Sequence, residues 1–311
     1  MVYAFDPEIA DTIPFLPSID AADPASIRAR LSEIVASSIS DAKGVMFSDL
    51  SVSGGTVGAG LPLRIYRPEL SSAPAAIYAV HGGGFIAGDL ELEHAQNIEL
   101  AREVGVVVIS VEYRLAPEVP FPGPLDDVYA GLVWLAENAG ELGVDRRRIA
   151  IHGVSAGGGL CAALALLARD RGGPDIAFQF LAVPALDDRI GTPSMTEYVD
   201  TPMWDRPNAI ASWEHYLGVG ARGTDEVSIY AAPARATDLA GLPPAYISVM
   251  HFDPLRDEGI AYAQALLAAG NTVELHLFPG TFHGSALIAR AKVSRRELTE
   301  RIAVLRQALA V

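Results

Sequence analysis

Short apolar stretches alternate with longer amphipathic ones along most of the chain. The short stretches are rich in β-branched residues and are bounded by Gly, Pro or polar turns, which is typical of strands. Eight such strands are predicted, at residues 45–52, 61–67, 75–80, 106–111, 148–152, 176–183, 245–250 and 273–278. The spacing predicts helices between and after them, at residues 91–104, 124–138, 160–168, 256–269 and 286–309. Strands that alternate with helices indicate a mainly parallel sheet, here preceded by a hairpin whose Gly-rich turn is residues 53–60.

Two segments depart from this alternation. In the first, Asp23 followed by Pro24 is a typical helix start, so we expect a helix over residues 24–35. The second lies between residues 184 and 244 and has one clear helix, at 207–217; a loop of roughly 60 residues without structure is unlikely in a compact core. We therefore expect an N-terminal cap segment (1–43), a catalytic core (44–311) and a cap insertion in that core (about 186–240).

Composition narrows the class of protein. Half of the 311 residues are hydrophobic, which is enough for a large core, yet the longest apolar run (160–168) is too short to span a membrane. A net charge of −15 argues against nucleic-acid binding, and a single cysteine excludes an internal disulfide framework. The first residues lack the basic and apolar regions of a secretory signal. We expect a cytoplasmic protein with no nucleic-acid partner and no membrane insertion.

The strongest local motif is at residues 153–159, which read Gly-Val-Ser-Ala-Gly-Gly-Gly. The order strand, Gly-x-Ser-x-Gly, helix is the context of a nucleophile elbow, a sharp turn that exposes a serine hydroxyl. The pattern alone is weak because Gly and Ser are common, but the flanking strand and helix favour Ser155 as a nucleophile. A second motif, His-Gly-Gly-Gly-Phe at 81–85, follows the third strand. Three glycines let backbone N–H groups approach a substrate, as acyl transfer requires.

The base and the acid are chosen by chain order, which in this class of site is nucleophile, acid, base. Asp253 follows the penultimate strand and is the expected acid, whereas its rival Asp257 lies a turn into the next helix and is expected to cap or pair there. His283 follows the last strand in a Gly-containing loop and is the expected base. His251 and His276 are expected to be structural. Of the others, His81 is expected to order its own glycine loop, and no partner can be inferred for His94, His152 and His215.

Six motifs in order resemble the hormone-sensitive-lipase-like (bacterial family IV) carboxylesterases of the α/β-hydrolase superfamily. They lie at residues 81–89, 113–118, 153–159, 186–189, 253–258 and 279–284. The resemblance implies an α/β-hydrolase fold, with an eight-stranded, mostly parallel sheet flanked by helices and covered by a helical cap. It also implies an oxyanion hole formed by the N–H groups of Gly83, Gly84 and Ala156. The chain departs from the family at Val154, where aspartate is often found, and at Gly159, where asparagine is frequent.

The function expected is hydrolysis of small carboxylic esters with short to medium acyl chains, through an acyl-enzyme on Ser155. This chemistry needs no cofactor or metal, and no ligand set for one is recognisable. A preference for an amide, a lactone or an acetylated natural product remains open, since the carbonyl chemistry is shared. A non-catalytic receptor and a true lipase are less favoured, and a homodimer is left open. Pocket lining and ordinary cap packing are both open for Trp204, Trp213, Tyr216, Phe5 and Phe15.

Overall fold

A single eight-stranded sheet organises the protein. The computed structural model describes residues 3–37, 41–53, 60–71 and 73–310. The strands are β1 (Val45–Val52), β2 (Leu61–Pro68), β3 (Ala76–Val80), β4 (Val107–Val111), β5 (Ile149–Val154), β6 (Phe178–Ala182), β7 (Ala245–Phe252) and β8 (Val273–Phe282). Their order is β1-β2-β4-β3-β5-β6-β7-β8; β2 is antiparallel to β1 and β4, and all other neighbours are parallel. The eight predicted strands are confirmed, while positions 54–59 of the predicted hairpin turn lie outside the described residues.

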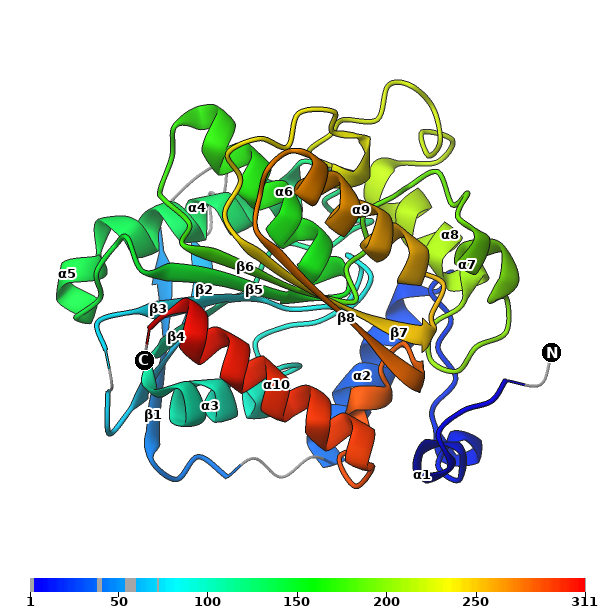
Figure 1. Cartoon of the computed structure of the whole chain (residues 1–311), viewed down its shortest axis with the longest axis horizontal. Coiled ribbons are helices and arrows are strands. Elements are labelled where there is room, and N and C mark those ends of the chain that lie inside the picture. The colour runs from blue at the N-terminus through cyan, green and yellow to red at the C-terminus, as the bar shows by residue number, and fades with distance from the viewer. Residues whose placement is uncertain (1–2, 38–40, 54–59, 72, 311) are drawn as a thin grey trace.

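Helices cover both faces of the sheet (Figure 1). One face carries α4 (Gly123–Glu137), α5 (Ala139–Leu142), α6 (Ala156–Arg171) and α9 (Arg256–Ala268), and the other carries α3 (His94–Leu100) and α10 (Lys292–Ala308). Strands β3 and β4 are buried along their whole length, because a parallel sheet is covered on both sides. Within the described residues, no helix is both long enough and apolar enough to cross a membrane.

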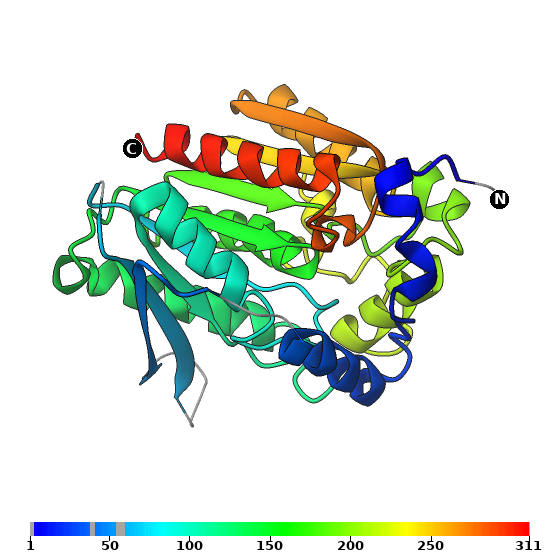
Figure 2. The same cartoon turned by 90° about the horizontal axis from the view of Figure 1, so that it is seen from below.

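The short helices α1 (Pro7–Ala10) and α7 (Pro193–Glu197), with α2 (Pro24–Ser37) and α8 (Arg206–Leu217), lie beyond the carboxyl ends of the central strands (Figure 2). Helix α2 begins as expected, with Pro24 in its first turn and the Asp23 carboxylate accepting hydrogen bonds from two backbone N–H groups. The segment before α2 is tied to the core by a hydrogen bond from Asp6 N to the Gly280 carbonyl (2.9 Å). Another bond joins it to α8, from Ala21 N to Asn208 Oδ1 (2.8 Å).

Several element boundaries differ from the sequence prediction, among them those of β8, α10 and α3. Strand β8 continues to Phe282, past the expected end at residue 278, because β8 is an edge strand that tolerates Pro279 and resumes pairing after an irregularity between Met250 and Phe252. Helix α10 begins at Lys292 and not at residue 286; Ala291 is extended, and Ile288 and Ala291 are buried against Phe282. The helix expected at 91–104 begins as turns and ends in a π-helical turn, Ala101–Gly105.

Candidate active site

Ser155 lies on the sharp turn between β5 and α6. Its backbone has φ 57° and ψ −118°, a strained conformation for a residue with a side chain, and its N–H donates to the Ala182 carbonyl at 2.8 Å. The glycines on either side are required sterically: a Cβ at Gly153 would overlap the Gly157 carbonyl, and a Cβ at Gly157 would overlap the Val80 carbonyl. The turn therefore has the tight packing expected of a nucleophile elbow.

The side chains of Ser155, His283 and Asp253 form a continuous hydrogen-bonded chain. His283 Nε2 lies 2.9 Å from Ser155 Oγ, and His283 Nδ1 lies 2.8 Å from Asp253 Oδ2. An ionised carboxylate can only accept, so the Nδ1 proton is donated to Asp253, and Nε2 is left to accept the serine proton. Asp253 is 1 % exposed and its Oδ1 accepts from Leu255 N at 2.9 Å, which fixes the carboxylate. All three sequence-predicted residues thus meet at the carboxyl edge of the sheet.

The rival residues lie elsewhere. Asp257 pairs with Arg256 (2.8 Å) and accepts from the N–H of Ser194 (2.8 Å), which is the capping and pairing role expected of it. His276 Nδ1 contacts Glu300 at 2.5 Å near α10. The His251 ring stacks on its neighbour Phe252. Cys161 is buried in α6, and burial raises the pKa of its thiol well above the ordinary value, so it is not a reactive thiolate.

The glycine loop at 82–84 lies beside Ser155. Gly83 and Gly84 have φ of 111° and 62°, a region that residues with side chains avoid. A Cβ on Gly83 would overlap the Ala87 carbonyl. Within the described residues, no hydrogen bond takes up the N–H of Gly83 or Gly84, and Ala156 begins α6, where backbone N–H groups are free of helical partners. These are the three donors that the sequence predicts for an oxyanion.

His81 stabilises this loop through a hydrogen bond and a ring contact. Its Nδ1 donates to the Gly82 carbonyl at 2.8 Å, and its ring stacks on Tyr113 at a centroid distance of 4.1 Å. The Tyr113 hydroxyl donates to the His81 carbonyl at 2.9 Å. Burial lowers the pKa of His81 to about 4, so the ring is neutral at pH 7. His81 is therefore a structural residue of the loop, as expected.

A cavity of about 330 Å³ opens onto Ser155 and His283. One wall is apolar and comes from the N-terminal segment and the insertion: Ile19, Ile27, Leu31, Ile34, Val35, Met203 and Trp204. The other end is polar and comes from α3 and α10: Glu93, Gln96, Glu297 and Arg301. Sequence reasoning missed both the α2 wall and Glu93. The apolar spacing along residues 27–35 could have indicated the first; a single glutamate at a helix start carries no signal for the second.

Of the aromatic side chains left open between pocket lining and packing, Trp204 lines the cavity. Trp213 and Tyr216 are buried against Phe85 instead, with ring centroids 5.2 and 4.1 Å away. Phe5 packs on Phe252 and Phe282 near the chain start, whereas Phe15 is 84 % exposed and meets solvent. Three of these aromatic residues, Phe5, Trp213 and Tyr216, therefore hold the cap on the core.

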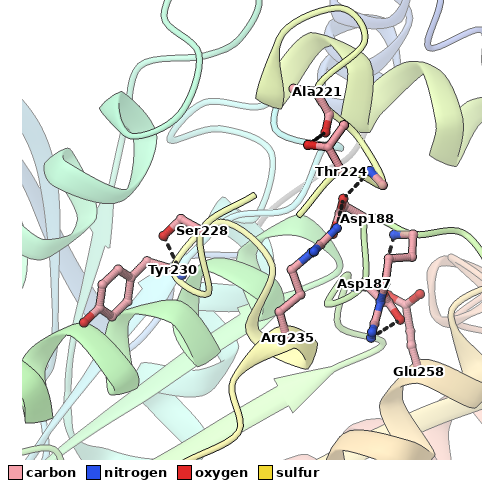
Figure 3. A network of polar contacts seen from close by, with 10 residues as sticks. Asp187, Asp188, Ala221, Thr224, Ser228, Tyr230, Arg235 and Glu258 are labelled. Atoms are coloured by element: carbon pink, nitrogen blue, oxygen red, sulfur yellow. Dashed lines mark hydrogen bonds and ion pairs between the residues drawn. The ribbon is translucent and has the colours of Figure 1, made fainter. Parts of the chain in front are cut away.

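A charge cluster stands where the insertion leaves the sheet (Figure 3). Asp188 pairs with Arg235 at 2.5 Å, and Asp187 pairs with Arg189 at 2.7 Å. Glu258 Oε1 accepts from Leu186 N at 2.6 Å. The preceding residue, Ala185, donates its N–H to the Ser155 carbonyl at 3.1 Å. The cluster thus anchors the backbone that supports the Ser155 turn, so residues 187–189 have a structural role.

Comparison with known proteins places this geometry in a family. The α/β hydrolase fold family matches residues 77–287. The chain belongs to this family. It is 38 % identical over 303 residues to the esterase LipI of Mycobacterium tuberculosis. This alignment covers 96 % of this chain and 93 % of LipI. It is 40 % identical over 275 residues to the carboxylesterase NlhH of the same species, covering 85 % of both chains.

Solved structures agree. A bacterial heroin esterase superposes with a TM-score of 0.94 at 50 % identity, covering 98 % of both chains. The esterase LipW from Mycobacterium marinum gives a TM-score of 0.87 at 38 % identity, covering 98 % of this chain and 96 % of LipW. These likenesses confirm the hormone-sensitive-lipase-like resemblance and the fold expected from the motifs. The chain is therefore a serine-type carboxylic-ester hydrolase.

Proposed function

We propose that Ser155, His283 and Asp253 carry out the ester hydrolysis as nucleophile, general base and orienting acid. The two hydrogen bonds of 2.9 and 2.8 Å that join them are the observation that supports this assignment. His283 takes the Ser155 proton as Oγ attacks the ester carbonyl, and Asp253 holds the ring tautomer and stabilises the imidazolium. The alcohol then leaves with that proton. Water attacks the acyl-enzyme by the same route and releases the acid.

The negative oxygen that forms during both steps is stabilised by backbone N–H groups. We assign this role to Gly83, Gly84 and Ala156, because no hydrogen bond among the described residues takes up the N–H groups of the two glycines and Ala156 adds a helix N-terminus. Donors held rigidly before the reaction need no reorganisation when the charge appears.

The substrate is an ester with a short to medium acyl chain. An apolar wall and a cavity of about 330 Å³ suit a small ester better than a long lipid. Relatives named arylesterase, from Saccharolobus solfataricus, and ethyl acetate hydrolase, from Pseudomonas putida, are 36 % and 35 % identical to this chain. Their names support small alkyl or aryl esters as the class to test.

The cap is assigned to two segments, residues 1–43 and the insertion at about 186–240, with residues 44–311 as the core that carries the insertion. Ile27 and Leu31 from the first segment and Trp204 from the second line the cavity, which supports this division. A homodimer and a cytoplasmic location are finer expectations, based on the sequence alone. Light scattering of the purified protein tests the first, and cell fractionation tests the second.

Hydrolysis of p-nitrophenyl esters from acetate to dodecanoate tests the function. Ser155→Ala should lower kcat about 10⁶-fold and abolish labelling by a fluorophosphonate probe, because the nucleophile is lost. Ser48→Ala, on the exposed side of β1, is the matched control and should behave as wild type. A Ser155→Ala protein that stays active, or that the probe still labels, would refute the assignment.

The same assay separates the alternatives. A substrate panel of matched esters, amides, lactones and acetylated natural products measures the reaction preferred, and a higher kcat/KM for the amide of equal size would replace the ester proposal. Folded wild-type protein that neither hydrolyses the panel nor reacts with the probe would favour a non-catalytic receptor.

A further inference from the structure

The carboxyl group of Glu93 contacts the glycine loop directly. Glu93 is the N-cap residue of α3, and its Oε1 accepts a hydrogen bond from Gly82 N at 3.0 Å. Gly82 immediately precedes the two glycines assigned to the oxyanion hole. It also packs on the nucleophile turn, since a Cβ on Gly82 would lie 3.0 Å from the Val154 carbonyl oxygen and 3.6 Å from Ser155 Cβ. Glu93 therefore holds a glycine of the loop that also packs on the nucleophile turn.

No ion pair of Glu93 is found among the described residues, although charged groups lie near it. It lines the active-site cavity, where Gln96 Nε2 is 3.4 Å from its Oε2. On α10, Arg301 is engaged by Glu297 (3.2 Å) and by the Gln96 side chain. Two other titratable groups, Tyr113 and Cys161, interact with Glu93, and burial raises the pKa of each so that both are uncharged at pH 7. His81, next to Gly82 in the chain, is neutral as well because burial lowers its pKa to about 4.

Val154 is an uncharged residue near the same loop. It occupies the elbow position where the resembled family often has aspartate, and its apolar side chain lines the same cavity. The elbow of this chain therefore brings no second carboxylate to the loop. Burial raises the pKa of Glu93 to about 7, against the opposing effects of the Gly82 N–H and Arg301. The carboxyl group therefore changes its charge near neutral pH.

We propose that Glu93 is a positioning residue that fixes the oxyanion loop through the Gly82 N–H, and that its uncharged acid form supports hydrolysis better than its carboxylate. This inference rests on the oxyanion role proposed above for Gly83 and Gly84. The hydrogen bond to Gly82 N holds the loop before the reaction begins, so that the N–H groups of Gly83 and Gly84 are already in position when the oxyanion forms. The charge acts differently, because the oxyanion exists only in the transition state.

A carboxylate bound to the oxyanion loop repels that developing charge. The sign follows from this. Glu93 is mainly the neutral acid below pH 7 and mainly the carboxylate above it. In the wild type, kcat/KM should therefore carry a component that falls as pH rises through about 7.

Two substitutions separate the two parts of the proposal. Glu93→Leu removes the acceptor for Gly82 N, and at pH 6 we expect kcat to fall about tenfold or more while KM changes less than about twofold. Glu93→Gln keeps an acceptor oxygen but cannot ionise. It should stay within about threefold of wild-type kcat at pH 6 and lose the fall in kcat/KM near pH 7. Glu99→Gln is the matched control, on the same helix, with a carboxyl pKa also raised by burial and no contact with the loop among the described residues.

The outcomes are distinct. Wild-type kcat in Glu93→Leu would overturn the positioning role, and an unchanged alkaline fall in Glu93→Gln would overturn the role of the charge. Thermal unfolding of each variant shows whether it folds, and if Glu93→Leu does not, the pH profile of Glu93→Gln decides alone. Fluorophosphonate labelling of Ser155 should persist in both variants. Activity in Ser155→Ala would instead overturn the proposed function, so the two failures cannot be confused.

Discussion

The edge of the sheet and the cap differ in how their residues are held in place. Ser155, Asp253 and His283 follow β5, β7 and β8 closely, so the strand ladders fix their backbones. The cap wall on α2 is held by a few side-chain contacts to the core, above all those of Arg28. Groups that perform the chemistry thus depend on the rigid sheet, while groups that shape the cavity depend on separate segments. Substitutions at the sheet edge should change kcat, and substitutions in the cap should change KM and substrate choice.

Asp253→Asn is expected to have the largest effect on kcat and tests the role of the sheet edge. An amide can donate to His283 and so favours the wrong tautomer, and kcat should fall about 10⁴-fold with little change in KM. Steady-state kinetics with p-nitrophenyl butyrate measures both constants. Asp257→Asn, four residues later in α9, keeps the sheet edge intact and should cost less than about threefold; equal losses in the two variants would mean that the acid is misassigned.

A smaller loss of kcat is expected from Gly83→Ala. The new Cβ would overlap the Ala87 carbonyl and force φ away from 111°, which displaces one oxyanion donor. Removal of one such donor costs about 10²- to 10³-fold in kcat. Gly140→Ala is the control, since its Cβ would meet nothing within 4 Å. If Gly83→Ala raised KM and left kcat unchanged, the loop would be a binding element and not an oxyanion hole.

The cap side of the comparison is tested by Leu31→Trp. Leu31 lines the cavity from α2, so a larger side chain should shorten the space for the acyl chain. We expect kcat/KM for the hexanoate to fall about tenfold relative to the acetate, in line with the 10- to 200-fold discrimination that apolar pockets reach per methylene. Arg30→Trp, on the exposed face of the same helix, should leave the ratio unchanged. A fall in kcat on the acetate ester itself would contradict the claim that cap residues affect substrate choice and not the chemical step.

The smallest effect is expected from Arg28→Gln. Arg28 donates to the Ile86 carbonyl (2.7 Å), the Ala116 carbonyl (3.0 Å) and the Glu118 carboxylate (2.7 Å), and so holds α2 on the core. Its loss should raise KM about two- to threefold without changing kcat. The control is Lys43→Gln, which also removes one positive charge but at an exposed position.

The same pair predicts a pH dependence of stability. The Arg28 guanidinium lowers the pKa of Glu118 to about 2. A lowered folded-state pKa stabilises the protein above the unfolded value, near 4.3, and that gain disappears as pH falls toward 2. Melting temperatures between pH 2 and 5 should therefore fall slightly more steeply in the wild type than in Arg28→Gln. The difference is small because the Glu118 side chain is 60 % exposed; parallel curves would show that the pair adds nothing.

The site was predictable where chain order and local turns determine it. Ser155 needs a strand, a Gly-flanked turn and a helix, all visible in the sequence, and Asp253 and His283 follow from the order of strands. The continuation of β8 past Pro279 was not predictable, because it depends on pairing with β7, a contact between residues far apart in the chain. Glu93 was missed for the same reason: its partner, Gly82, belongs to another element. Contacts between elements, and not local propensity, decide such cases.

The attachment of the N-terminal segment has a consequence for biosynthesis. Residues 6–31 leave the ribosome before the groups that hold them, since Ala21 bonds to Asn208 and Asp6 bonds to Gly280. These two bonds, which fix the segment before α2, can therefore form only after most of the chain has been translated. Completion of the substrate cavity is thus a late event in the life of the nascent polypeptide, because His283 also lines it and is translated more than 250 residues after Leu31.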